Sequence, residues 1–205
     1  MTASETRSTR APKLPAEERR HQIIDAAVPI FARKGYAAAG TVEIAQAAGV
    51  SEPTIYRYFE SKQELYIAAM RRNAEEVMVN WERIASENEN PLNALLTLGQ
   101  WYMMTLKERP ELLSLRFRSV TDSADPAVLD EARELYLQIL GFTEGLFVKA
   151  KEQGFLAPTT ETRTMAWLFM AVGSLMDQIN LLGLQEELLP RDLVSIGNVL
   201  LEGRR

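Results

Sequence analysis

Hydroxyl and cationic side chains gather in one short segment, Thr54 to Lys62, with the sequence TIYRYFESK. Hydroxyl, ammonium and guanidinium groups donate hydrogen bonds to phosphate oxygens, and a guanidinium also fits base edges in the major groove of DNA. This combination on one short segment indicates a surface that recognises nucleic acid. The whole chain has a net charge of −5, so such a surface would be local and not part of a generally basic protein.

Side chains that commonly carry catalysis are scarce in this sequence. The 205 residues include no cysteine and a single histidine, His21. Disulfides, cysteine nucleophiles and thiolate metal sites are therefore excluded, and no glycine-rich phosphate loop is present. Asp177 is the main acidic residue isolated in an apolar segment. We expect no enzyme, no metal and no cofactor; an enzyme built as a helical bundle around an aromatic pocket is the rival class.

Two short helices are predicted to position the TIYRYFESK segment. The first spans 41–48 and ends at Gly49, and Ser51 can cap the second, over 51–59. An amphipathic helix over 16–34 precedes them. Two short helices joined by a glycine turn and packed under an earlier helix form a helix-turn-helix unit.

The remainder of the chain is also predicted to be helical, because the period-3.6 apolar pattern is pervasive and glycine and proline are sparse. Ser61 and Glu64 form a capping box that begins a long helix reaching about residue 85. Five further helices are expected near 91–107, 110–120, 126–152, 160–183 and 190–202. The expected fold is all-α, with about nine helices.

These elements divide the chain into three predicted parts. Residues 1–15 read as a disordered basic arm, 16–62 as the helix-turn-helix DNA-binding domain, and 63–205 as a larger helical bundle for ligand binding and dimerisation. The longest apolar runs are well short of the roughly 20 residues that span a bilayer. The N-terminus also lacks the apolar stretch of a signal peptide. We expect no membrane association and a cytoplasmic location.

The segment from Gly35 to Leu65 resembles the N-terminal signature of the TetR family of transcriptional regulators. The matching elements are GY, TVEIA, AGVS, TIYRYF and SKQEL. The resemblance implies a bacterial, nucleoid-associated homodimer that binds a palindromic operator in double-stranded DNA. It further implies a repressor that a small apolar or aromatic effector releases from DNA. A transcriptional activator, or an architectural DNA-binding protein without an effector, is the alternative.

The resemblance also assigns roles to residues by position. Tyr56, Tyr58 and Lys62 would contact phosphates. Thr54 and Arg57 would face the major groove. The complete set of expected DNA-binding residues is Thr41, Ser51, Glu52, Pro53, Thr54, Tyr56, Arg57, Tyr58 and Lys62.

Three positions depart from the common pattern of the family. Pro53 stands where glycine is frequent, and it stiffens the first turn and lacks one backbone donor. Glu52 stands where a lysine or polar residue is frequent; it either accepts from a cytosine amino group or complements the helix dipole. Gly40 replaces a second threonine beside Thr41. These departures concern base preference and leave the fold unaffected.

Aromatic and methionine side chains are abundant in the larger domain and suit an adaptable apolar pocket. Each of them alone also fits a packed core. A polar group of the ligand is expected near Arg116. The expected pocket residues are Trp81, Trp101, Phe117, Phe142, Trp167, Met170 and Arg116.

The last two predicted helices, 160–183 and 190–202, are apolar on two sides. One side can pack on its own domain and the other on a partner subunit, which would give a four-helix dimer interface. The alternative is that both are internal core helices. The expected interface residues are Leu168, Val172, Leu175, Ile179, Leu193, Ile196 and Leu200.

Overall fold

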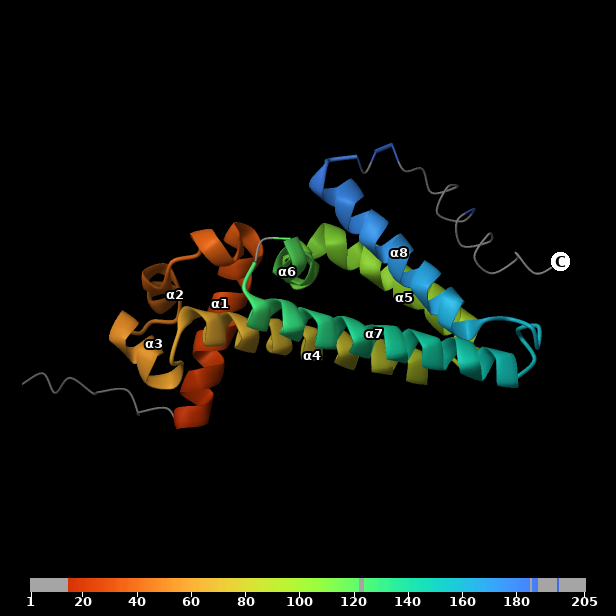
Figure 1. The fold of residues 1–205 in the computed structure, drawn as a ribbon, viewed down its shortest axis with the longest axis horizontal. Helices are drawn as coiled ribbons and strands as arrows, with labels where there is room; N and C mark the ends of the chain where they lie inside the picture. The colour runs from red at the N-terminus through yellow and green to blue at the C-terminus, as the bar shows by residue number, and fades with distance from the viewer. Residues whose placement is uncertain (1–14, 122–123, 185, 188–194, 196–205) are drawn as a thin grey trace, which may run out of the picture.

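A computed structural model describes residues 15–121, 124–184, 186–187 and 195, and this part of the chain forms eight α-helices without a strand (Figure 1). The all-α prediction is confirmed. The expected arm and the expected helix over 190–202 lie almost entirely outside the described residues. Within the described ranges, no helix combines the length and the apolar content that crossing a membrane requires.

The N-terminal domain is a small three-helix unit of α1 (Ala16–Ala38), α2 (Thr41–Ala47) and α3 (Glu52–Tyr58). The only non-helical dihedrals inside α1 occur at Gly35, with φ 74° and ψ 173°. Such values are nearly confined to glycine, so Gly35 interrupts the helix where the sequence predicts its end. The core of this three-helix domain includes fully buried side chains from all three helices and from the α3–α4 turn: Ile23, Phe31, Ile44, Ile55 and Phe59.

Helix α4 (Lys62–Ser86) begins at the N-terminal domain and runs along the larger domain beside α7 (Figure 1). The Ser61 side chain accepts a hydrogen bond from the Glu64 backbone N–H at 3.1 Å, as the capping box predicts. The Glu64 carboxylate accepts from the Glu60 N–H at 2.6 Å. The start of α4 is therefore fixed by local contacts on both sides of the turn.

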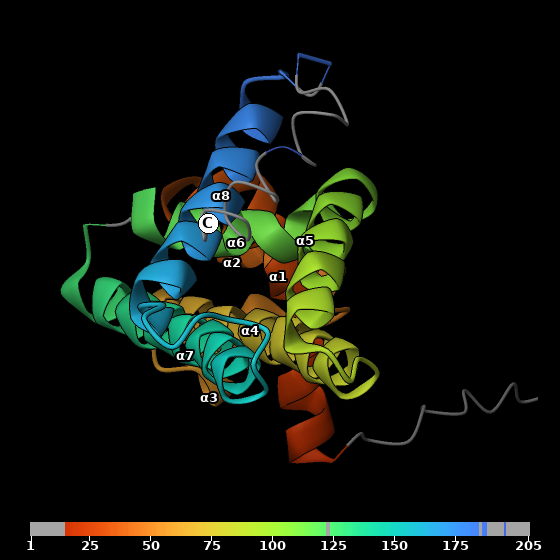
Figure 2. The ribbon, with the colours of Figure 1, turned by 90° about the vertical axis from the view of Figure 1, so that its right-hand side faces the viewer.

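The larger domain adds α5 (Pro91–Glu108), α6 (Pro110–Thr121), α7 (Pro126–Glu152) and α8 (Thr162–Leu181). Proline at the first position suits α5, α6 and α7, because a helix leaves its first N–H groups unpaired. Along the long axis of the molecule, α4, α5, α7 and α8 surround α6 (Figure 2). Helix α6 packs against α1 and also contacts α4, α5, α7 and α8.

Buried apolar side chains form two clusters. One lies in the N-terminal domain and the first turns of α4, and it also includes Leu115 of α6 and Val128 and Ala132 of α7. The other fills the larger domain. The first cluster therefore contains residues from both sides of the boundary predicted at 62–63, and α6 and α7 pack against the N-terminal domain.

Candidate DNA-binding surface and ligand cavity

Helix α3 is held by its inner face and presents its outer face to solvent. Ile55 and Phe59 are buried in the small core, whereas Tyr56 and Arg57 are exposed and Tyr58 is partly exposed. The Arg57 guanidinium lies 5.9 Å from the centre of the Tyr58 ring. Hydroxyl and cationic groups therefore lie together on one side of a short helix, as phosphate and base contacts require.

Three of the expected DNA-binding side chains contact one another at the start of α2. The Thr41 hydroxyl donates to the Glu52 carboxylate at 2.5 Å, and the Tyr56 hydroxyl donates to the Thr41 oxygen at 3.4 Å. Glu52 also lies in the first turn of α3, where a negative charge complements the helix dipole. In this structure Glu52 thus joins α3 to α2; a cytosine contact stays a prediction.

Ser51 occupies the N-cap position of α3, but its hydroxyl bonds no backbone N–H of that helix. It pairs instead with the Thr54 hydroxyl at 2.8 Å. The reason is local: Pro53 has no N–H to donate, and the Thr54 N–H already donates to the Ser51 carbonyl at 2.9 Å. The predicted N-cap position of Ser51 is confirmed, but its side chain does not make the capping hydrogen bond.

The side chain of Lys62, in the first turn of α4, contacts the C-terminal end of α1. Its ammonium donates to the Ala37 carbonyl at 3.1 Å and lies 4.9 Å from the centre of the Tyr36 ring. Partial burial lowers the pKa of Lys62. An ammonium carries three donors, so the Ala37 contact leaves capacity for a phosphate oxygen.

Polar side chains in the first half of α4 form hydrogen bonds with residues at the start of α7. Gln63 donates from its amide nitrogen to the Asp125 carboxylate at 2.6 Å, and Asp125 also caps α7 by accepting from the Ala127 N–H. About two turns further along α4, Arg71 makes two hydrogen bonds, at 2.8 and 2.6 Å, to Glu131 of α7. The first half of α4 is therefore held to α7 as well as to α1.

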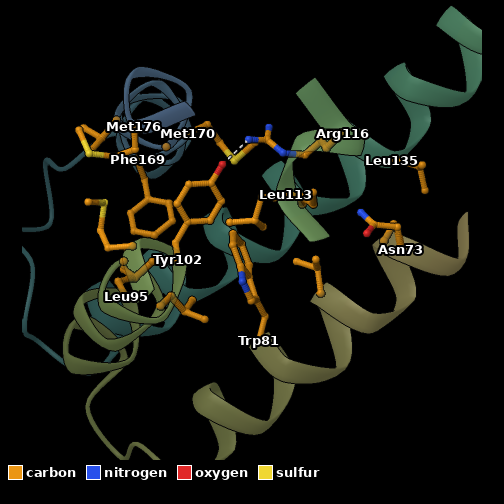
Figure 3. Close-up of a pocket in the computed structure, with 18 of the residues that line it drawn as sticks. Asn73, Trp81, Leu95, Tyr102, Leu113, Arg116, Leu135, Phe169, Met170 and Met176 are labelled. Atoms are coloured by element: carbon orange, nitrogen blue, oxygen red, sulfur yellow. Dashed lines mark hydrogen bonds between the residues drawn. The ribbon is translucent and has the colours of Figure 1, made fainter. Parts of the chain in front are cut away.

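A cavity of about 600 Å³ lies in the larger domain, lined by residues of α4, α5, α6, α7 and α8 (Figure 3). A volume of this size is typical of small-molecule sites. Three of the expected pocket residues, Trp81, Arg116 and Met170, line it. Most of the other lining side chains are aliphatic, aromatic or methionine, so the wall is mainly apolar.

Four expected pocket residues do not line this cavity. Trp101 is partly buried and packs against the apolar cluster of the larger domain. Phe117 lies at a separate small hollow on α6 and α8. Phe142 packs against Trp81 with ring centres 5.9 Å apart. Trp167 is 46% exposed and lies beside the Tyr136 ring.

The cavity is lined instead by three aromatic side chains that the sequence analysis did not select: Tyr102, Phe147 and Phe169. The sequence predicts aromatic side chains at the cavity wall, but it does not predict which face of each helix turns towards the cavity. Because α5, α7 and α8 carry apolar residues on more than one face, periodicity leaves open which face turns inward.

Three polar side chains, Tyr102, Arg116 and Asp177, form a hydrogen-bonded cluster beside the cavity. Arg116 donates to the Asp177 carboxylate at 2.7 Å and to the Tyr102 hydroxyl at 2.8 Å, and that hydroxyl donates to Asp177 at 2.5 Å. Figure 3 shows the Arg116–Tyr102 contact. Burial raises the pKa of Asp177 and of Tyr102, although Arg116 opposes both shifts. Helices α5, α6 and α8 are therefore linked by one polar cluster.

The outer face of α8 carries exposed apolar side chains. Leu168 and Leu175 are each 44% exposed, whereas Val172 and Ile179 are half-buried against the large core. The expected interface residues on α8 are thus divided between two faces. The remaining three, Leu193, Ile196 and Leu200, lie outside the described residues.

Residues 23–69 match the family model described as bacterial regulatory proteins, tetR family. The HTH-type transcriptional activator FasR of Mycolicibacterium smegmatis is 46% identical over 69 residues, which are 34% of this chain and 32% of FasR. The chain therefore spans about a third of that relative. The HTH-type transcriptional repressor BepR of Brucella suis is 28% identical over 172 residues, or 80% of each protein.

A solved structure extends this similarity to the larger domain. The transcriptional regulator FadR of Bacillus subtilis, in complex with stearoyl-CoA, matches with a TM-score of 0.72. The match covers 90% of this chain and 99% of FadR, at 19% identity. At that identity the match supports the fold alone.

Proposed function

This chain belongs to the TetR family of bacterial regulatory proteins, and on that premise we propose that it is a ligand-responsive transcriptional regulator. It acts as a homodimer on a palindromic operator, most simply as a repressor that a small apolar or aromatic molecule releases from DNA. The observation that carries this proposal is the match of residues 23–69, because that segment contains α2, α3 and the start of α4.

The geometry of α3 supports a role in DNA recognition. A helix-turn-helix places its second helix in the major groove and contacts the backbone with flanking residues. Here Tyr56 and Arg57 are exposed on α3, and Lys62 lies one turn away at the start of α4. We propose that Thr54 and Arg57 face base edges and that Thr41, Tyr56, Tyr58 and Lys62 contact phosphates.

The cavity supports the ligand-responsive part of the proposal. It has the size and the apolar lining of a small-molecule site, and α4 connects its wall to the DNA-binding surface. FadR, which shares the fold, is described in complex with stearoyl-CoA. A larger domain without any effector would instead fit the architectural alternative.

The sign of regulation has support in both directions. BepR is named a repressor, and the match to it covers most of both chains. FasR is named an activator, and the match to it covers 34% of this chain and 32% of FasR. We favour a repressor, with an activator as the second candidate.

Selection of bound fragments from a random double-stranded DNA library tests this function directly. We expect enrichment of inverted repeats whose half-sites lie about one helical turn apart, roughly 34–36 Å. Arg57→Ala should change the enriched bases, whereas Arg163→Ala, at an exposed position of α8, should leave them unchanged. Enrichment of no sequence at all would reject the proposed function.

A further inference from the structure

Two polar atoms on the cavity side of α4 are buried without a hydrogen-bond partner in the described part of the chain: the Asn73 Oδ1 and the Trp81 Nε1. Both side chains are 4% exposed and line the cavity. Figure 3 shows both extending from α4 towards the other lining residues. Buried polar atoms are nearly always paired in folded proteins. Their position therefore points to a partner that enters the cavity.

The two atoms need hydrogen-bond partners of opposite kinds, one a donor and the other an acceptor. An amide oxygen only accepts hydrogen bonds, and an indole N–H only donates them. Asn73 and Trp81 lie eight residues apart on α4, which corresponds to about 12 Å along a helix axis. Val77, which also lines the cavity, lies between them. A ligand that satisfies both atoms needs a donor at one end, an acceptor at the other, and an apolar body in between.

The charge of the cavity wall indicates an uncharged ligand. Arg116 is the one charged side chain among the described residues that line the cavity. It is already paired with Asp177 at 2.7 Å and with Tyr102 at 2.8 Å. A ligand carboxylate could reach Arg116 only by displacing Asp177, which would leave that carboxylate buried without its counter-ion.

We propose that the cavity binds an elongated, uncharged amphiphile whose hydroxyl donates to Asn73 and whose carbonyl accepts from Trp81. This inference rests on the proposed function, since it assigns the chemistry of the effector in the same cavity. It moves the polar anchor from Arg116, where the sequence places it, to α4. Recognition then occurs on the helix whose first turn lies at the DNA-binding surface.

Displacement of the dye Nile red from the full-length protein, without DNA, tests the proposal. The probes are methyl decanoate, the methyl ester of ω-hydroxydecanoic acid, and decanoic acid in its ionised form. We expect both esters to bind more tightly than the ionised acid. Tighter binding by the acid, or no displacement by any of the three, would overturn the proposal.

The variant Asn73→Leu separates the two polar contacts. It should weaken binding of the hydroxy ester about tenfold relative to methyl decanoate, because the ligand hydroxyl would be buried unpaired. Trp81→Phe should weaken both esters by a similar factor, about three- to tenfold, because both carry the carbonyl. Asn80→Leu on α4 and Trp167→Phe on α8, both outside the cavity lining, are the matched controls and should change neither affinity.

The stability of the ligand-free Asn73→Leu variant gives an independent measurement. Replacing an unpaired buried amide by an apolar group of similar size should raise the Tm by about 2–4 °C. A lower Tm would mean that the amide has a partner in the free protein, and it would overturn the proposal.

The two proposals can fail separately. If the ester affinities keep the same ratio in Asn73→Leu, the inference fails while selection of operator DNA is unaffected. If the esters bind as expected but the protein enriches no DNA sequence, the proposed function fails and the ligand chemistry stands.

Discussion

The side chains expected at DNA are already engaged with one another in the free protein. Thr41 donates to Glu52, Tyr56 donates to Thr41, and Lys62 donates to the Ala37 carbonyl. A phosphate that approaches Thr41 or Tyr56 competes with these contacts, and the Glu52 carboxylate lies close enough to repel it. Net binding energy at this surface is therefore smaller than the number of donors suggests, because each contact with DNA replaces an existing one.

Lys62→Ala should weaken binding to operator and to unrelated DNA alike, because a phosphate contact carries no sequence information. The salt dependence of binding should fall by about one unit of slope, which corresponds to one phosphate contact fewer. Titrations at several salt concentrations measure both quantities. Lys149→Ala, in the last turn of α7, is the control and should leave the slope unchanged. An unchanged slope in Lys62→Ala would mean that α4 begins away from the DNA backbone.

Breaking the buried cluster should have a large effect on stability. Asp177→Ala leaves the Arg116 guanidinium, 21% exposed, without its carboxylate, and we expect a loss of about 3 kcal/mol in the free energy of unfolding. The triple variant Tyr102→Phe/Arg116→Met/Asp177→Leu should recover most of that loss, since an apolar set of similar size avoids both the cost of a buried charge and that of an unpaired buried hydroxyl.

Urea unfolding measures these differences. Glu144→Ala, which breaks the more exposed pair with Arg163, is the control and should cost less than about 1 kcal/mol. Equal costs for Asp177→Ala and Glu144→Ala would contradict the view that the cluster is buried and coupled.

The residue types of both sites could be predicted from the sequence, but their partners could not. Tyr56, Arg57 and Lys62 stand out because their chemistry suits phosphate. The Thr41–Glu52 contact joins two helices, and the Arg116–Asp177 contact joins residues 61 positions apart. Such contacts depend on how helices pack, which the local pattern does not contain.

At the level of helices, the ends were predictable and the faces were not. The sequence predicts a helix over 110–120, and the structure has Pro110–Thr121. Capping residues and proline act within a turn, so they are visible in a short window. Which face of α5 or α8 turns to the cavity depends on the neighbouring helices. That is why Trp101 and Trp167 were placed at the cavity and lie elsewhere.

The exposed face of α8 leads to a prediction about assembly. Leu168 and Leu175 are half-exposed on a helix whose other face is buried in the large core. If this face forms a dimer interface, Leu175→Glu buries an unpaired charge between subunits and should produce monomers. Specific operator affinity should be lost with the dimer, because one subunit contacts only one half-site.

Sedimentation at micromolar concentration measures the assembly state. Val79→Glu provides the control, since Val79 is an exposed apolar residue on α4, away from α8, and this variant should stay dimeric. A wild-type protein that sediments as a monomer would refute the prediction.

At the level of the whole molecule, α4 and α6 connect the cavity to the DNA-binding surface. Trp81 of α4 lines the cavity, while Lys62 of the same helix lies at the proposed DNA surface. Helix α6 carries Arg116 at the cavity and packs against α1. A ligand releases DNA only if it favours an arrangement of these helices that binds DNA poorly. The apolar cavity and its connection to the DNA-binding domain are thus two parts of one proposed response.

Filling the cavity should separate ligand response from DNA binding. Gly99 of α5 lines the cavity, and a Cβ at this position would meet no atom within 4 Å. Gly99→Leu therefore projects an apolar side chain into the space that a ligand needs, and glycine inside a helix is a poor helix former. We expect the variant to fold, to bind operator DNA with wild-type affinity, and to lose the response to small molecules.

The measurement begins with a thermal-shift screen of apolar and aromatic compounds on the wild-type protein, followed by operator-release titrations with the compounds that stabilise it. Gly141→Leu on α7, where a Cβ also meets no atom within 4 Å and which does not line the cavity, is the matched control and should respond as wild type. A ligand present at a hundred times its Kd stabilises the folded protein by about 2.7 kcal/mol, so its loss in Gly99→Leu is readily seen. If Gly99→Leu releases DNA at the same ligand midpoint as wild type, the effector binds outside this cavity.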